Sequence, residues 1–123
     1  MPDNGLRFKE FKDEIDTLID FLTSDTWEFH GTPNPNPERI RASYENQYYT
    51  GDDCKTFWVI LDQDTKVGMI RIYDLEDGTP LFDIRILSKY KGMGVGTIAI
   101  NWLVDYVFNN FSDKERIEGN TRQ

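Results

Sequence analysis

Three glycines at alternate positions, Gly92, Gly94 and Gly96, are the residues that point most directly to chemistry. Glycine adopts positive φ angles and lets a ligand approach the backbone closely. A helix is predicted to begin at this point, and a helix start presents unpaired N–H groups and a partial positive charge. The spacing therefore predicts a cradle for phosphate groups, supplemented by the side chains of Lys89 and Lys91.

Two other types of phosphate loop can be compared with this segment. A P-loop is excluded because no Gly-Lys is followed by Ser or Thr. Residues 94–99 (Gly-Val-Gly-Thr-Ile-Ala) match a dinucleotide fingerprint loosely, but that fingerprint opens a parallel sheet, whereas a meander is predicted before this one. A glycine turn with no ligand is the structural alternative.

The segments that must position the loop follow from hydrophobic periodicity. Apolar residues at helical spacing predict a helix over residues 15–22, and Asn36 can cap a second helix that starts at Pro37 and runs to about Tyr48. A long third helix follows the glycines, with an apolar face and a polar stripe. Strands are predicted over residues 6–11, 56–61, 67–73, 81–87 and 114–119. This order predicts an α+β fold.

The composition narrows the class of protein. A chain of 123 residues with 38% hydrophobic residues predicts a single domain with a real core. The net charge of −8 argues against nucleic acid and anionic lipid as partners. The longest apolar run, residues 57–61, is far too short to span a membrane, and no secretory leader is evident. A single cysteine, Cys54, forms no internal disulfide, so we expect a cytoplasmic protein.

The acidic charge lies in the first half. Residues 1–64 hold 6 basic and 14 acidic side chains, whereas residues 65–123 hold 8 of each. This asymmetry favours a cationic substrate, one that would bind near Glu28, Asp52 and Asp53. No ligand clusters have metal spacing, so we expect no metal.

The loop resembles a known family motif. Residues 91–96 (Lys-Gly-Met-Gly-Val-Gly) resemble the Arg/Gln-x-x-Gly-x-Gly/Ala motif of the GNAT superfamily of acetyl-CoA-dependent N-acetyltransferases, with Lys91 in first place. The strand over residues 81–87 resembles the family's fourth strand, and residues 116–120 resemble the RimJ/RimL-type branch. The resemblance implies a mixed sheet with an antiparallel meander and one strand–helix–strand crossover. It also implies acetyl transfer from acetyl-CoA, as co-substrate, to a primary amine by direct attack in a ternary complex.

The resemblance assigns roles in cofactor binding. Backbone N–H groups of the loop would hold the pyrophosphate, and the backbone of the fourth strand would align the pantetheine arm like an added strand. A backbone N–H on that strand would also stabilise the thioester oxygen. The cofactor-binding residues implied in this way are Ile84, Ile86, Leu87, Lys91, Gly92, Met93, Gly94, Val95, Gly96 and Thr97.

The resemblance also suggests a proton acceptor. Asp83 stands where relatives often carry a glutamate, although it is equally explained as a strand carboxylate that is paired with Arg85 or Arg71 or is simply exposed. His30, the only histidine, is the second candidate, and its structural alternative is a hydrogen-bonded histidine without a catalytic role. Aromatic residues that could wall the acceptor pocket, or simply fill the core, are Trp27, Phe29, Tyr44, Tyr48, Tyr49 and Trp58. Cys54 beside two aspartates is not expected to be a nucleophile.

Relatives of this type usually continue with another helix and two strands. Residues 1–123 are therefore expected to form one acetyltransferase-like domain that is C-terminally truncated, with an open sheet edge that a homodimer could complete. The alternative functions are a non-catalytic acyl-CoA-binding module, an inactive truncated acetyltransferase, and a nucleotide-binding or structural domain.

Overall fold

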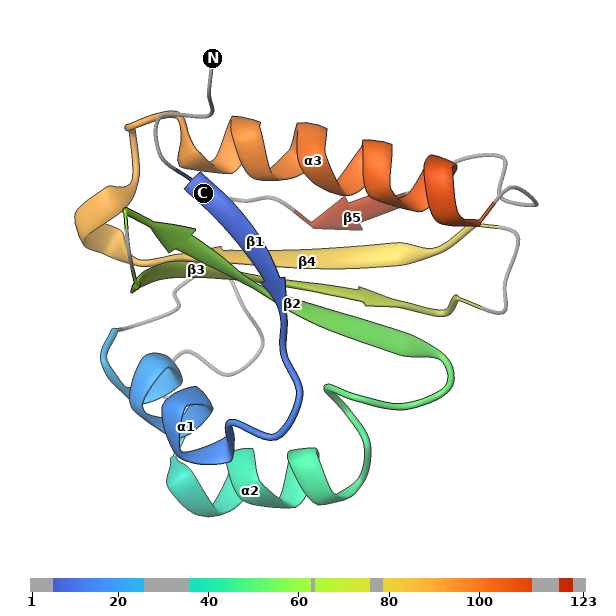
Figure 1. Cartoon of the computed structure of the whole chain (residues 1–123). Coiled ribbons are helices and arrows are strands. Elements are labelled where there is room, and N and C mark those ends of the chain that lie inside the picture. Colours follow the sequence, from blue (N-terminus) through green and yellow to red (C-terminus); the bar gives the residue numbers. More distant parts are fainter. Residues whose placement is uncertain (1–5, 26–35, 63, 76–78, 112–117, 121–123) are drawn as a thin grey trace.

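The computed structural model describes residues 6–25, 36–62, 64–75, 79–111 and 118–120. Within these ranges the elements form a central sheet with helices on both faces (Figure 1). The helices are α1 (Ile15–Thr23), α2 (Pro37–Glu45) and α3 (Val95–Asn110), with a short 3₁₀ turn η1 (Ser88–Tyr90). The strands are β1 (Leu6–Glu10), β2 (Cys54–Leu61), β3 (Thr65–Tyr73), β4 (Leu81–Ile86) and β5 (Glu118–Asn120).

The strand order in the sheet follows the chain, β1-β2-β3-β4-β5. The first four strands are antiparallel neighbours, and β5 pairs in parallel with β4 through α3. A parallel pair needs such a crossover, whereas antiparallel neighbours need only turns. The meander and the strand–helix–strand crossover are thus confirmed, as is the α+β class.

The two faces of the sheet carry separate apolar clusters. On the α3 face, Ile84 and Ile86 of β4 pack with Ala99 and Leu103 of α3, all nearly inaccessible to solvent. On the other face, Trp58 packs with apolar residues of α1 and α2. Successive residues of a strand point to opposite faces, so β4 contributes Phe82, Ile84 and Ile86 to the first cluster and leaves Asp83 and Arg85 for the second face.

The ends of several elements differ from the predictions. Asn36 does cap α2, because its side chain accepts a hydrogen bond from the Arg39 N–H at 2.8 Å. The helix ends at Glu45 rather than near Tyr48, since Gln47 takes a left-handed φ of 64° and the Tyr48 N–H turns back to the Ser43 carbonyl. The last strand is described at Glu118–Asn120, and residues 114–117 of its predicted range lie outside the described residues.

The third helix has the amphipathic character that the sequence indicates. Val95, Ala99, Leu103 and Val107 are buried, while the polar stripe at Thr97, Asn101, Asp105 and Asn109 is exposed. Among the described helices, none is long and apolar enough to cross a membrane.

Candidate active site

The glycine-rich turn leads from η1 into α3. Gly92 and Gly94 have φ angles of 82° and 83°, in the left-handed region that other residues rarely adopt. The Gly94 carbonyl accepts the first helical hydrogen bond, from the Ile98 N–H at 3.1 Å. Helical geometry leaves the N–H groups of Val95, Gly96 and Thr97 without intrahelical acceptors. These donors lie together at the positive end of the helix, as an anion site requires.

A cavity of about 350 Å³ opens beside this turn. A methyl group built on Gly92, Gly94 or Gly96 would meet no atom of the described chain within 4 Å. The glycines therefore keep the backbone open towards this space. The space suits a pyrophosphate, and the positive charge of Lys91 would offset the charge of the phosphates. The cavity is lined by Ile86, Lys91, Gly92, Gly94, Gly96, Thr97 and Ile100.

The far edge of β4 is available beside this cavity. Among the described residues, β5 pairs only with Leu81–Asp83, so the second half of β4 has no strand on that side. The Leu87 N–H donates to the Val67 carbonyl on the β3 side, at 2.9 Å. Because backbone groups alternate along a strand, the N–H groups of Ile84 and Ile86 point away from β3, and Ile86 lies beyond the residues of β4 that pair with β5.

The backbone of Leu87 makes two hydrogen bonds within the chain. The family resemblance implies that Leu87 offers backbone partners to a pantetheine arm along with Ile84 and Ile86. Its N–H donates to the Val67 carbonyl, and its carbonyl accepts from the Tyr90 N–H at 2.8 Å. The strand has ended by Leu87 and the chain is already entering η1, whereas the Ile86 N–H faces the far edge of β4.

A tie between distant segments holds the start of the turn, and no sequence pattern indicates it. Asp25, just after α1, accepts hydrogen bonds from the Ser88 N–H and, at 3.0 Å, from the Ser88 hydroxyl. A carboxylate suits the N-terminal end of η1, because that end exposes backbone donors. Asp25 thereby fixes the connection from β4 to the glycines.

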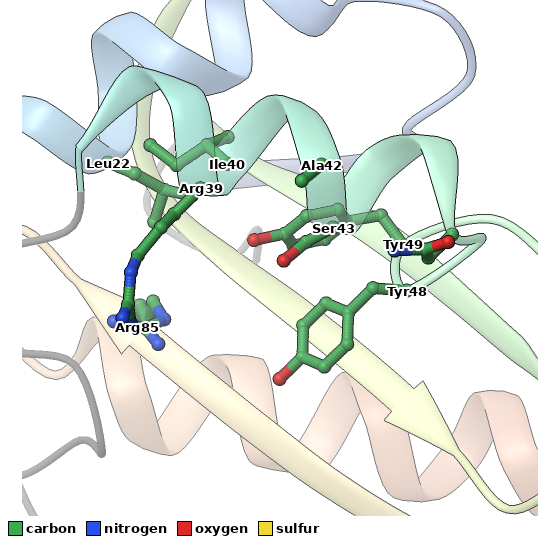
Figure 2. A pocket seen from close by; sticks show the side chains of 9 residues that line it. Leu22, Arg39, Ile40, Ala42, Ser43, Tyr48, Tyr49 and Arg85 are labelled. Atoms are coloured by element: carbon green, nitrogen blue, oxygen red, sulfur yellow. The ribbon is translucent and has the colours of Figure 1, made fainter.

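A second cavity, of about 310 Å³, lies on the other face of the sheet, between α2 and β4. Figure 2 shows the side chain of Arg39 extending from α2 towards that of Arg85 on β4, with Tyr48 farther along the cavity. Burial raises the pKa of Tyr49 to about 12, so its phenol stays neutral over the ordinary pH range. The lining residues are Leu22, Arg39, Ile40, Ala42, Ser43, Asn46, Tyr48, Tyr49 and Arg85.

Asp83, the first candidate proton acceptor, lies next to this cavity. Its carboxylate is 3.6 Å from the Nε of Arg85, and both side chains are only 16% exposed. Arg71 stands opposite Asp83 across the strand pair. The contact with Arg85 is one of the pairings that the non-catalytic interpretation of Asp83 named. His30, the second candidate, lies outside the described residues.

The aromatic residues divide between the second cavity and the core. Tyr48 and Tyr49 line the cavity, whereas Trp58 is fully buried in the core cluster between the sheet and α1. Tyr44 is not among the lining residues and instead hydrogen-bonds Asp13 at 3.1 Å. Trp27 and Phe29 lie outside the described residues.

The two arginines of the second cavity are not predicted by any sequence motif. The sequence suggests Arg85 only as a partner for Asp83, and Arg39 belongs to a predicted helix face with no motif around it. An arginine at a buried strand position is the one local signal that could have pointed to Arg85.

In the part of the chain that the structure describes, no three His, Cys, Asp or Glu side chains gather as a metal site would require.

Comparison with solved structures shows the same fold in several acetyltransferases. A Vibrio cholerae spermidine N-acetyltransferase chimera superposes with a TM-score of 0.75 at 17% identity, covering 92% of this chain and 68% of that one. The Vibrio cholerae spermidine N-acetyltransferase in complex with CoA and spermine gives 0.71 at 17% identity, covering 89% and 68%. A domain from Methanocaldococcus jannaschii gives 0.66 at 14%, covering 87% and 72%. At these identities the likeness establishes the fold alone.

Sequence comparisons define the family. A search of curated protein sequences gives no match. The family model described as "Acetyltransferase (GNAT) family" matches residues 19–122, which is most of the chain and includes the glycine turn, β4 and α3. The match therefore agrees with the fold and with the open cavity at the start of α3. The chain belongs to the GNAT family of N-acetyltransferases, whose acetyl donor is acetyl-CoA.

Proposed function

We propose that this chain transfers the acetyl group of acetyl-CoA to a primary amine by direct attack in a ternary complex. The observation that carries the proposal is that neighbouring residues of β4 line two cavities on opposite faces of the sheet. Ile86 lines the cavity at the glycine turn, and Arg85, the preceding residue, lines the cavity beneath α2. Donor and acceptor would thus approach the same short stretch of strand from opposite faces.

The donor would bind along the first cavity and the edge of β4. The loop N–H groups and Lys91 suit the pyrophosphate, and the outward backbone groups of Ile86 suit an amide of the pantetheine arm. The thioester carbonyl would then lie beside an N–H of β4, which stabilises the negative charge that develops on its oxygen.

The reaction forms one C–N bond and breaks one C–S bond. The amine nitrogen attacks the thioester carbon, CoA leaves as the thiolate, and the amine proton moves to a base while the thiolate gains a proton. An alkylamine has a pKa of about 10.4, so a base is needed near neutral pH. We propose Asp83, acting through a water molecule, with His30 as the second candidate.

The test begins with binding. Calorimetric titration with acetyl-CoA, with NAD as control, should give micromolar binding of acetyl-CoA only. Release of free thiol is then followed with a panel of primary amines. Asp83→Asn should lower kcat by roughly 100-fold or more while leaving the affinity for acetyl-CoA unchanged. Asp105→Asn, on the exposed stripe of α3, is the matched control. Full activity of Asp83→Asn would move the base role to His30, tested by His30→Gln.

A second function is favoured by one observation. The Asp83 carboxylate already contacts Arg85, so the proposed base is in part neutralised. The alternative is a non-catalytic module that binds acyl-CoA. Tight binding of acetyl-CoA without thiol release on any amine would support this alternative and contradict the transferase proposal.

The branch of the family, the acceptor amine, the cellular location and the oligomeric state are also proposals. The likeness of residues 116–120 to the RimJ/RimL-type branch is the first of these proposals. The Vibrio cholerae spermidine N-acetyltransferase in complex with CoA and spermine adds spermine to the panel. The single cysteine favours a cytoplasmic location. Light scattering would test the homodimer, which a monodisperse monomer would contradict.

A further inference from the structure

Among the described residues, the two charged side chains that line the α2–β4 cavity are both positive. Arg39 reaches it from α2 and Arg85 from β4 (Figure 2). The other polar residues of its described wall are the neutral Ser43, Asn46 and Tyr49 together with Tyr48, and no aspartate or glutamate is among the lining residues. This is unexpected in a chain whose net charge is −8.

The surroundings of the cavity add more positive than negative charge. Arg71 stacks its guanidinium on Tyr48, 3.6 Å from the ring centre, and its Nε donates to the Tyr48 carbonyl at 2.7 Å. Among the described residues, a carboxylate also lies nearby, that of Asp83, and its Oδ2 is 3.6 Å from the Nε of Arg85. In this described part of the chain, Arg39, Arg85 and Arg71 thus lie near this space together with the one carboxylate of Asp83, which favours an oxyanion over a polycation.

The acidic residues that the sequence links to a cationic acceptor are not found in the described wall of this cavity. Asp52 and Asp53, expected from the sequence to attract a cationic acceptor, do not line the cavity, and Glu28 lies outside the described residues. Arginine is also well suited to oxyanions, because its planar guanidinium binds a carboxylate with two parallel hydrogen bonds.

We propose that the acceptor is a small amine that carries a carboxylate or a similar oxyanion, held by Arg39 and Arg85. This inference rests on the proposed acetyl transfer and names its class of acceptor. The carboxylate would lie between α2 and β4, and the amine would point towards Asp83 and the edge of β4. A volume of about 310 Å³ suits an amino acid or a compound of that size.

The test compares amines that differ only in the carboxylate. Suitable pairs are phenylalanine with phenethylamine and ornithine with putrescine, with spermidine as the polycation. The acid of each pair should give the higher kcat/KM. Arg39→Gln should lower kcat/KM for the acids about 10- to 100-fold, the range expected for a hydrogen bond between charged groups, and should barely change it for the parent amines.

Arg39 is the better variant because Arg85 also contacts Asp83, so changing Arg85 would disturb the proposed base. Arg41→Gln is the matched control, since it removes the same charge from the same helix two residues away. Arg41 does not line the cavity, and its contact with Asp16, 3.8 Å between exposed groups, contributes little stability. It should behave as the unchanged protein.

The outcomes separate this inference from the proposed function. Turnover of spermidine and putrescine with no preference for acids would overturn the inference and leave the transferase activity standing. If acetyl-CoA binds but no amine is acetylated, calorimetry with phenylalanine and ornithine decides. Binding that Arg39→Gln weakens and Arg41→Gln does not would support the anion site. No binding of either acid would overturn it.

Discussion

Arg85 and Ile86 are neighbours in β4, and their side chains line two different cavities on opposite faces of the sheet. The alternation of side chains along a strand produces this arrangement without any special backbone geometry. Ile86 lies within the α3 cluster and borders the glycine turn, whereas Arg85 faces α2. One strand thus separates the proposed donor and acceptor spaces.

Gly68 sets how closely β3 approaches this part of β4. A methyl group at this position would lie 2.7 Å from the Cδ1 of Ile86 and 2.8 Å from the carbonyl oxygen of Arg85. The backbone carbonyl cannot move without shifting β4, so we expect Gly68→Ala to lower the free energy of unfolding by about 1–3 kcal/mol. Urea denaturation measures this. Unchanged stability would show that β4 moves freely.

Gly96 and Gly94 should respond differently to the same methyl group. Gly96 lies in the first turn of α3 with ordinary helical backbone, so Gly96→Ala should keep or raise stability and weaken acetyl-CoA binding by filling the phosphate space. Gly94 has a φ of 83°, so Gly94→Ala should cost about 1–2 kcal/mol of stability as well as affinity. Thermal unfolding and calorimetry check both. Unaltered affinity in Gly96→Ala would place the phosphates elsewhere.

Tyr49 should make the fold sensitive to alkali. Burial raises its pKa in the folded state from 10.0 to about 12, so the folded state holds the phenolic proton more tightly than the unfolded state. This contribution is complete below pH 10 and is lost as the pH rises from 10 to 12, by about 2–3 kcal/mol in total.

Tyr49→Phe should therefore lose less stability over this interval than the unchanged protein, measured by urea denaturation at pH 9, 10 and 11. Tyr73 and Tyr106 also have raised pKa values, but they are present in both proteins and cancel in the comparison. Identical slopes for the two proteins would contradict the prediction.

Features that depend on local chemistry could be predicted from the amino-acid sequence. The alternate glycines, the Asn36 cap with Pro37 behind it, and the apolar face of α3 are each specified by neighbouring residues. A positive φ, a capping hydrogen bond and a helical period of apolar residues involve only a few successive positions, so they can be recognised without knowing the fold.

The contacts between residues far apart in the chain depend on the tertiary structure and could not be predicted from the sequence. Arg39 and Arg85 belong to a helix and a strand far apart in the chain, and no local pattern indicates that they share a cavity. The hydrogen bond from the Leu87 N–H to the Val67 carbonyl likewise depends on strand register, and the contact of Asp25 with Ser88 depends on how α1 packs. Register is set by burying one face of every strand at once, so it is a property of the whole sheet rather than of any segment.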